Sequence, residues 1–270
     1  MRRSWLILIT TGTLAFGGML ATAGPAAASP GFGHPLTQNF TPGGLVRSIT
    51  GAPGGGDFTQ VVQSTNWAGY VAVGSNGEAT SVTSNWTQPT AHCSFGNQYS
   101  AFWVGLDGYN SSTVEQTGTE ADCIGRTAEY SAWYEFYPAD PVYFSEPVQA
   151  GDQFTGTVSY AAGQFTVTLT DHSQSWSQSY TQAVPGAARS SAEVIVEAPC
   201  CSYGGSPLPL TSFGSVNFSS ALVNGQGLCT TSPVQMIMVT QYGKQQVNVS
   251  PMANCEKFTV AYRGGSAWGF

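Results

Sequence analysis

Short apolar runs with alternating polar positions fill the chain from about residue 64 onward. The clearest β-branched and aromatic runs are 69–73, 81–86, 101–106, 132–137, 153–160, 164–170, 192–196, 234–241 and 257–262. Each run has the length of a strand and is bounded by turn residues, and amphipathic helical periodicity is hard to find in this part. The Asn-Gly pairs Asn76-Gly77 and Asn224-Gly225 are typical of hairpin turns. The pattern predicts an all-β domain, a sandwich or barrel of antiparallel sheets.

Alternation within several runs separates an apolar face from a face that mixes aromatic residues with acids. The mixed face carries Trp103, Gly105 and Asp107 of one run, Trp133, Glu135 and Tyr137 of the next, and Glu193, Ile195 and Glu197 of a third. A simply solvated face would carry small polar residues instead. Large aromatics between carboxylates favour a concave surface that holds an extended ligand.

The N-terminus has the features of an export signal. Arg2 and Arg3 precede an apolar stretch from Trp5 to about Leu20, and the small residues 26–28 end it. A membrane anchor is the alternative, but threonines and glycines interrupt the stretch. We therefore expect a signal peptide over 1–28, a linker or pro-segment rich in Gly, Pro, Ser and Thr over 29–63, and one folded domain over 64–270. A secreted, extracellular protein with no membrane segment follows.

The charge balance argues against one class of partner. The chain has 8 Lys+Arg and 15 Asp+Glu, a net charge of −7, and no basic cluster. A nucleic-acid binder needs several Lys or Arg on one face, so we expect no nucleic acid partner. Only 9% of residues are charged, so few ion pairs are lost on acidification, which fits an acidic working environment.

Six cysteines in an exported chain suggest disulfides, although six cysteines allow fifteen connectivities. We expect at least one bridge, with Cys93–Cys123 and Cys229–Cys255 as the candidate pairs. Cys200 and Cys201 are adjacent and are not expected to bond each other. The spacing resembles no zinc site, and we expect neither a metal nor another cofactor.

An amide and a carboxylate form the most informative pair. Gln116 and Glu197 lie at matching positions in two otherwise apolar, strand-like segments. A carboxylate on a strand whose reverse face is lined by valines is a candidate functional group in a substrate groove. A primary amide that faces the same groove would supply a neutral hydrogen-bond donor. Such a pair can hydrolyse an amide bond without serine, cysteine, histidine or metal.

Four strings in order carry a family resemblance. They are Trp-Val-Gly-Leu-Asp-Gly at 103–108, Gln-Thr-Gly at 116–118, Ala-Trp-Tyr-Glu-Phe-Tyr-Pro at 132–138 and Ala-Glu-Val-Ile-Val-Glu at 192–197, and Asn-Trp-Ala-Gly at 66–69 precedes them. Together they resemble the glutamic peptidases, or eqolisins. The resemblance extends from about Ser64 to Glu197, and the texture of the remaining chain agrees with it.

The resemblance implies a sandwich of two antiparallel sheets, concanavalin- or lectin-like, with substrate across a concave groove. It implies that Gln116 and Glu197 are catalytic. Residues that bind substrate or support the site are implied to be Trp67, Trp103, Asp107, Trp133 and Glu135. Two departures, Glu115 before the glutamine and Ala198-Pro199-Cys200-Cys201 after the glutamate, affect the pH profile and the subsite preference more than the chemistry.

The expected enzyme is a secreted glutamic endopeptidase that cuts proteins or peptides at acid pH as a monomer. Ionised Glu197, near its reference pKa, would act as general base on a bound water, and Gln116 would stabilise the oxyanion. The competing class is a carbohydrate-active sandwich, a glycosidase or lectin, in which Glu135 and Glu197 would be the paired acids. Gln116 argues against this class, because an amide at that position cannot serve as the second acid of a glycosidase. His92 before Cys93 resembles a serine-peptidase segment, but no Gly-Asp-Ser-Gly string accompanies it.

Overall fold

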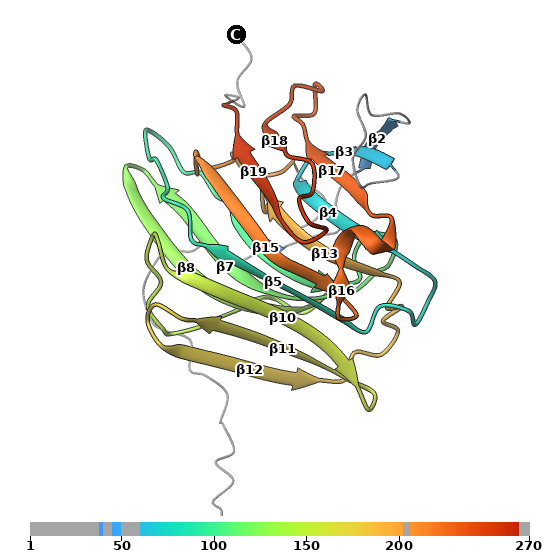
Figure 1. The fold of residues 1–270 in the computed structure, drawn as a ribbon. Coiled ribbons are helices and arrows are strands. Elements are labelled where there is room, and N and C mark those ends of the chain that lie inside the picture. The colour runs from blue at the N-terminus through green and yellow to red at the C-terminus, as the bar shows by residue number, and fades with distance from the viewer. Residues whose placement is uncertain (1–37, 40–44, 50–59, 202–205, 265–270) are drawn as a thin grey trace, which may run out of the picture.

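Two stacked sheets form the domain (Figure 1). The computed structural model describes residues 38–39, 45–49, 60–201 and 206–264. The expected signal peptide and most of the expected pro-segment lie outside these ranges. Within them no helix is long and apolar enough to cross a membrane.

The nine-stranded sheet carries the segments singled out above. Its strands run in the order β2 (Leu45–Ile49), β3 (Gln60–Ser64), β17 (Val234–Met238), β4 (Trp67–Val73), β13 (Ser191–Glu197), β6 (Ala101–Leu106), β7 (Val114–Ile124), β8 (Thr127–Tyr137) and β9 (Val142–Tyr143). All neighbours are antiparallel except β17 and β3, which are parallel. The described chain therefore adds β2 and β3 to this sheet ahead of the first strand that the sequence pattern indicated.

The second sheet has eight strands. Its order is β12 (Trp176–Gln182), β11 (Gln164–Asp171), β10 (Gln153–Ala161), β5 (Ser81–Thr87), β15 (Ser215–Val223), β19 (Phe258–Tyr262) and β18 (Val247–Val249), with β16 (Gln226–Gly227) beside β15. A short ladder joins β1 (Gln38–Asn39) to β14 (Cys200–Cys201). The one helical element in the described ranges is a 3-10 turn at Leu228–Thr231. The all-β, two-sheet expectation is confirmed.

The main core lies between the sheets and follows from the alternation of each strand. Phe102, Val104 and Leu106 of β6 are fully buried there and pack with apolar residues of the second sheet. Trp86 of β5 stacks on Phe154 of β10, with ring centroids 5.9 Å apart. The opposite residues of the nine-stranded sheet point away from this core, and they form the candidate site.

Of the two Asn-Gly pairs expected to form hairpin turns, one does so. Asn224-Gly225 joins β15 to β16 as a two-residue hairpin, with positive φ at both residues, as expected. Asn76-Gly77 does not form a hairpin, because β4 before it and β5 after it belong to different sheets. Both expected disulfides are confirmed, Cys93–Cys123 and Cys229–Cys255.

Candidate active site

Gln116 and Glu197 lie on the same face of the nine-stranded sheet, away from the core between the sheets. Glu197 on β13 pairs in register with Trp67 on β4 and with Ala101 on β6. Gln116 on β7 pairs with Gly105 on β6 and with Glu135 on β8. Strand β6 therefore runs between the amide and the carboxylate, and it has only small side chains, Ala101 and Gly105, at the two flanking positions.

Two side chains hold the carboxylate of Glu197. Asn66 Nδ2 donates to Oε1 at 3.0 Å, and Trp103 Nε1 donates to Oε2 at 3.0 Å. Trp67 packs edge-on against Trp103, with ring centroids 5.1 Å apart. The Trp67 indole N–H makes no hydrogen bond of normal geometry within the described residues, but it is close enough to favour the charged form of Glu197. Two hydrogen bonds thus fix the carboxylate in place, and the Trp67 indole lies beside it.

Gln116 is oriented by a buried acid. Its Nε2 donates to Glu135 Oε2 at 2.6 Å, while Oε1 has no hydrogen-bond partner in the described part of the chain. The nitrogen end of the amide is therefore the end that faces Glu135. The second N–H of the same nitrogen is left for another acceptor.

Burial changes the titration of both acids. Burial raises the pKa of Glu197 well above its ordinary value, while the indole and amide donors around it oppose the rise and Glu120 adds to it. Burial also raises the pKa of Glu135, with the Gln116 hydrogen bond opposing and the Glu197 charge adding to it. The expectation of a Glu197 near its reference pKa is therefore wrong, because the residue has no contact with solvent in this structure.

A third carboxyl group joins the site, and the sequence analysis missed it. Glu120 on β7 pairs in register with Ala101, the residue that also pairs with Glu197 from the other side. Ser131 Oγ donates to Glu120 Oε2 at 2.9 Å, and the Tyr143 hydroxyl donates to Oε1 at 3.2 Å. Burial raises the pKa of Glu120 to about 7, against these two hydrogen bonds. The only signal in the sequence was that Glu120 follows Gln116 by four residues, which places both side chains on the same face of a strand.

The remaining expected site residues divide into two kinds. Trp133 is fully buried on this face, opposite Gly118, in one apolar cluster with Trp67 and Trp103. A Cβ at Gly118 would come within 2.6 Å of the Trp103 Cβ, so the glycine makes room for that indole. Asp107 instead accepts from the backbone N–H of Arg189 at 2.7 Å and of Ser190 at 2.9 Å, which anchors the chain entering β13.

His92 and His172, the histidines in the described ranges, lie away from this face. His92 lies in a loop beside the Cys93–Cys123 bridge. His172 lies in the turn after β11 and hydrogen-bonds Thr155 Oγ1 at 2.8 Å. Across the described ranges, no three His, Cys, Asp or Glu side chains gather as a metal-binding group.

Comparison with known proteins agrees with this arrangement. Residues 65–262 match the family described as the Peptidase A4 family. The chain belongs to this family. As a member, it is a glutamic endopeptidase, an eqolisin, which acts on peptides or proteins. Membership decides against the carbohydrate-active alternative for this site.

Named relatives of this eqolisin are fungal. It is 31% identical to aspergillopepsin-2 of Aspergillus niger over 224 residues, which are 74% of this chain and 78% of that protein. It is 31% identical to scytalidopepsin B of Scytalidium lignicola over 173 residues, 60% of this chain and 64% of that protein.

Solved structures show the same fold. The crystal structure of scytalido-glutamic peptidase with a peptide-based transition-state analogue superposes with a TM-score of 0.63 at 23% identity, over 74% of this chain and 98% of that one. Aspergilloglutamic peptidase from Aspergillus niger superposes with a TM-score of 0.51 at 26% identity, over 62% of this chain and 99% of that one.

Proposed function

We propose that this eqolisin is a secreted endopeptidase in which Glu197 activates a water molecule and Gln116 stabilises the oxyanion. The observation that carries the proposal is the placement of the two side chains on one sheet face, with β6 between them and each held by a buried partner. A peptide lying across β6 would present its carbonyl to both groups. Two disulfides support an oxidising, extracellular location.

Glu197 acts as the general base in this mechanism. Its ionised form takes a proton from water, and the resulting hydroxide attacks the scissile carbonyl carbon. The protonated Glu197 then donates that proton to the leaving amine. Because burial raises the pKa of Glu197, the group holds its proton well enough to serve as the acid in this second step. The same shift places the acid limb of the activity profile above the ordinary value for a glutamate.

Gln116 stabilises the negative charge that develops during the reaction. The N–H that does not contact Glu135 donates to the oxygen of the tetrahedral intermediate, where negative charge develops. Loss of one such donor costs about 3 kcal/mol, or 10²–10³ in rate. An amide does not titrate at working pH, so it donates over the whole range in which Glu197 works. Trp67, Trp103 and Trp133 give this chemistry an apolar surround.

The test is digestion of a denatured protein between pH 3 and pH 7, with an inhibitor of aspartic peptidases present. Full-length protein and a form beginning at Gln60 are compared, because residues 29–63 are proposed to be a pro-segment or linker. Gln116→Ala and Glu197→Gln are expected to lose cleavage. The matched controls Gln153→Ala and Glu129→Gln, away from the site, are expected to retain it. Cleavage by folded Glu197→Gln at the wild-type rate would refute the mechanism.

A further inference from the structure

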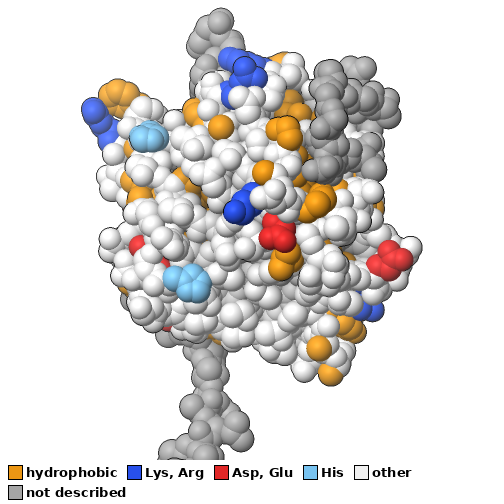
Figure 2. Space-filling view, viewed as in Figure 1, with side chains coloured by type: hydrophobic (Ala, Val, Ile, Leu, Met, Phe, Trp, Pro, Cys, Tyr) orange, Lys and Arg blue, Asp and Glu red, His pale blue; other side chains and the backbone are white. Residues whose placement is uncertain are grey.

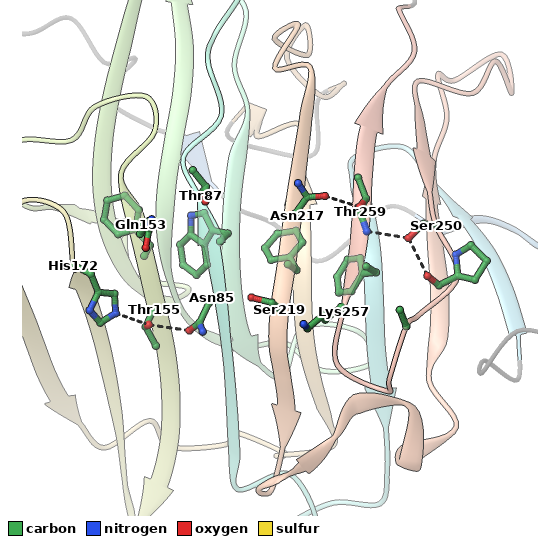
Figure 3. A pocket seen from close by; sticks show the side chains of 16 residues that line it. Asn85, Thr87, Gln153, Thr155, His172, Asn217, Ser219, Ser250, Lys257 and Thr259 are labelled. Atoms are coloured by element: carbon green, nitrogen blue, oxygen red, sulfur yellow. Dashed lines mark hydrogen bonds between the residues drawn. The ribbon is translucent and has the colours of Figure 1, made fainter.

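A polar hollow lies on the outer face of the eight-stranded sheet, on the opposite side of the sandwich from Gln116 and Glu197. It has a volume of about 490 Å³ and crosses β10, β5, β15 and β19 (Figure 3). Trp86, Phe218 and Phe258 of these strands point into the core beneath it. The alternate residues of the same strands therefore form the floor, and this floor plays no part in the peptidase site.

The lining of the hollow is almost entirely neutral. Its polar neutral groups are the amides of Asn85, Gln153 and Asn217 and five serine or threonine hydroxyls, and its apolar ones are Trp86, Phe154, Phe218, Pro251, Ala253 and Phe258. Lys257 and His172 are its only basic side chains, and it contains no carboxylate, although the chain has 15 acidic residues. Figure 2 shows the surrounding face with few charged groups. Such a lining offers many hydrogen bonds without selecting a charged ligand.

Hydrogen bonds organise the amides. Thr155 Oγ1 donates to Asn85 Oδ1 at 2.8 Å, and Thr259 Oγ1 donates to Asn217 Oδ1 at 2.6 Å (Figure 3). Because the oxygen end of each amide is engaged, the Nδ2 end is the one left to donate to a ligand. The two asparagines stand on adjacent strands, since Asn85 pairs with Ser219, two residues beyond Asn217.

The dimensions suit a chain rather than a single small molecule. Four strands at the usual spacing give a floor about 14 Å across. The volume falls within the range of ligand sites, roughly 300–1,000 Å³. Hydroxyls that both donate and accept, on an uncharged and extended ligand, match a lining of amides and hydroxyls. A peptide would favour a free strand edge or apolar pockets, and an anion would favour more than two basic groups.

We propose that this hollow binds a neutral polysaccharide chain, without cutting it. Binding would hold the peptidase on a carbohydrate matrix while the opposite sheet remains free for protein substrates. The proposal does not depend on the catalytic mechanism, because the two sites lie on different sheets.

The test is affinity electrophoresis of the full chain in gels that contain a neutral polysaccharide, with a β-glucan, a xylan, a mannan and a galactan tested in turn and an acidic polysaccharide run beside them. Production in a host without N-glycosylation matters, because Asn85 and Asn217 each begin an Asn-X-Ser/Thr sequon and a glycan would fill the hollow. We expect retardation in at least one gel. The double variant N85A/N217A should weaken that binding at least fivefold and leave peptidase activity unchanged.

The matched control removes two groups from the same outer face but outside the hollow. Thr168 and Ser179 hydrogen-bond each other across β11 and β12, and T168A/S179A should bind as wild type does. A bulky variant, Asn217→Arg, should also abolish retardation if the hollow is the site. No retardation in any neutral gel would overturn the proposal. So would equal loss in both double variants, or retardation only by an acidic polysaccharide, which would make Lys257 and His172 an anion site.

Discussion

The side-chain nitrogen of Gln116 donates to Glu135 Oε2 at 2.6 Å, inside a face where both residues are fully buried. Each residue pairs with the other in register on β7 and β8. In the proposed mechanism, Glu135 thereby decides which end of the Gln116 amide points at the substrate. A residue of this kind positions the catalytic group and need not touch the reacting atoms.

Glu135→Gln should therefore lower kcat with little change in KM. A glutamine at 135 can donate or accept, so the Gln116 amide loses its single orientation. We expect a loss of roughly tenfold or more, smaller than the 10²–10³ expected when one oxyanion donor is removed. Steady-state kinetics beside Gln116→Ala give the comparison. A Glu135→Gln enzyme with wild-type kcat would show that the amide is oriented by other contacts.

Glu120→Gln should move the acid limb of the pH profile of kcat/KM to lower pH. Glu120 raises the pKa of Glu197 across Ala101, so its removal lets the general base stay ionised in more acidic solution. Ser131 and Tyr143 donate hydrogen bonds to the Glu120 carboxyl group. Burial raises the pKa of Tyr143, and the charges of Asp122 and Glu135 lie close enough to add to that rise. The conservative control is Ser131→Ala, which leaves the carboxyl in place. An unmoved limb in Glu120→Gln would contradict the coupling.

Trp103→Phe should move the same limb in the opposite direction. The indole N–H of Trp103 stabilises ionised Glu197, and phenylalanine has no donor. The pKa of Glu197 should rise, and less base should be available at acid pH. The ring also packs against Trp67, so thermal unfolding must be measured alongside activity. Displacement of the limb toward acid in this variant would rule out the proposed role of the N–H.

Glu115 should make the protein less stable as the pH rises. It faces the core between the sheets, opposite Leu106 and Phe136, and burial followed by the charge of Asp107 raises its pKa from 4.5 to about 8. The folded state therefore binds the proton more tightly than the unfolded state. The contribution is complete below about pH 4.5 and is lost as the pH rises to about 8, at most about 5 kcal/mol in total.

Urea unfolding at pH 4, 6 and 8 tests this dependence. Glu115→Leu should unfold at higher urea than wild type at pH 8, and the difference should shrink at pH 4. Glu129→Gln, on the half-exposed part of β8, is the matched control and should leave the pH dependence unchanged. A wild-type stability that rises from pH 4 to pH 8 would contradict the assignment.

The sequence predicted which face of a strand each side chain lies on better than it predicted which strands lie next to each other in the sheet. Period-two alternation placed Trp103 and Glu197 on one face and Val104 and Val196 on the other, because strand geometry leaves no alternative. The position of β13 between β4 and β6 depends on long-range pairing, which no local pattern encodes. Glu120 and Asn66 were missed for that reason, since only register brings them to Glu197.

Two other differences have physical causes. Strand β12 was not expected, because its outer face carries serines that pair with threonines of β11 in place of an apolar signal. The Asn76-Gly77 turn was expected to be a hairpin, but a turn signal reports that the chain reverses and not which sheet receives the next strand. The pKa of Glu197 could not be read from its neighbours in sequence, since burial is a property of the whole fold.

Gln116 and Glu197 belong to interior strands of the sheet, and no loop supplies either group. Their separation is set by the same backbone ladder that holds β7, β6 and β13 together. Local melting at the periphery should consequently leave the distance between amide and carboxylate intact. On gradual heating, this eqolisin should keep its specific activity until the whole domain unfolds, so that the inactivation curve and the unfolding curve have one midpoint.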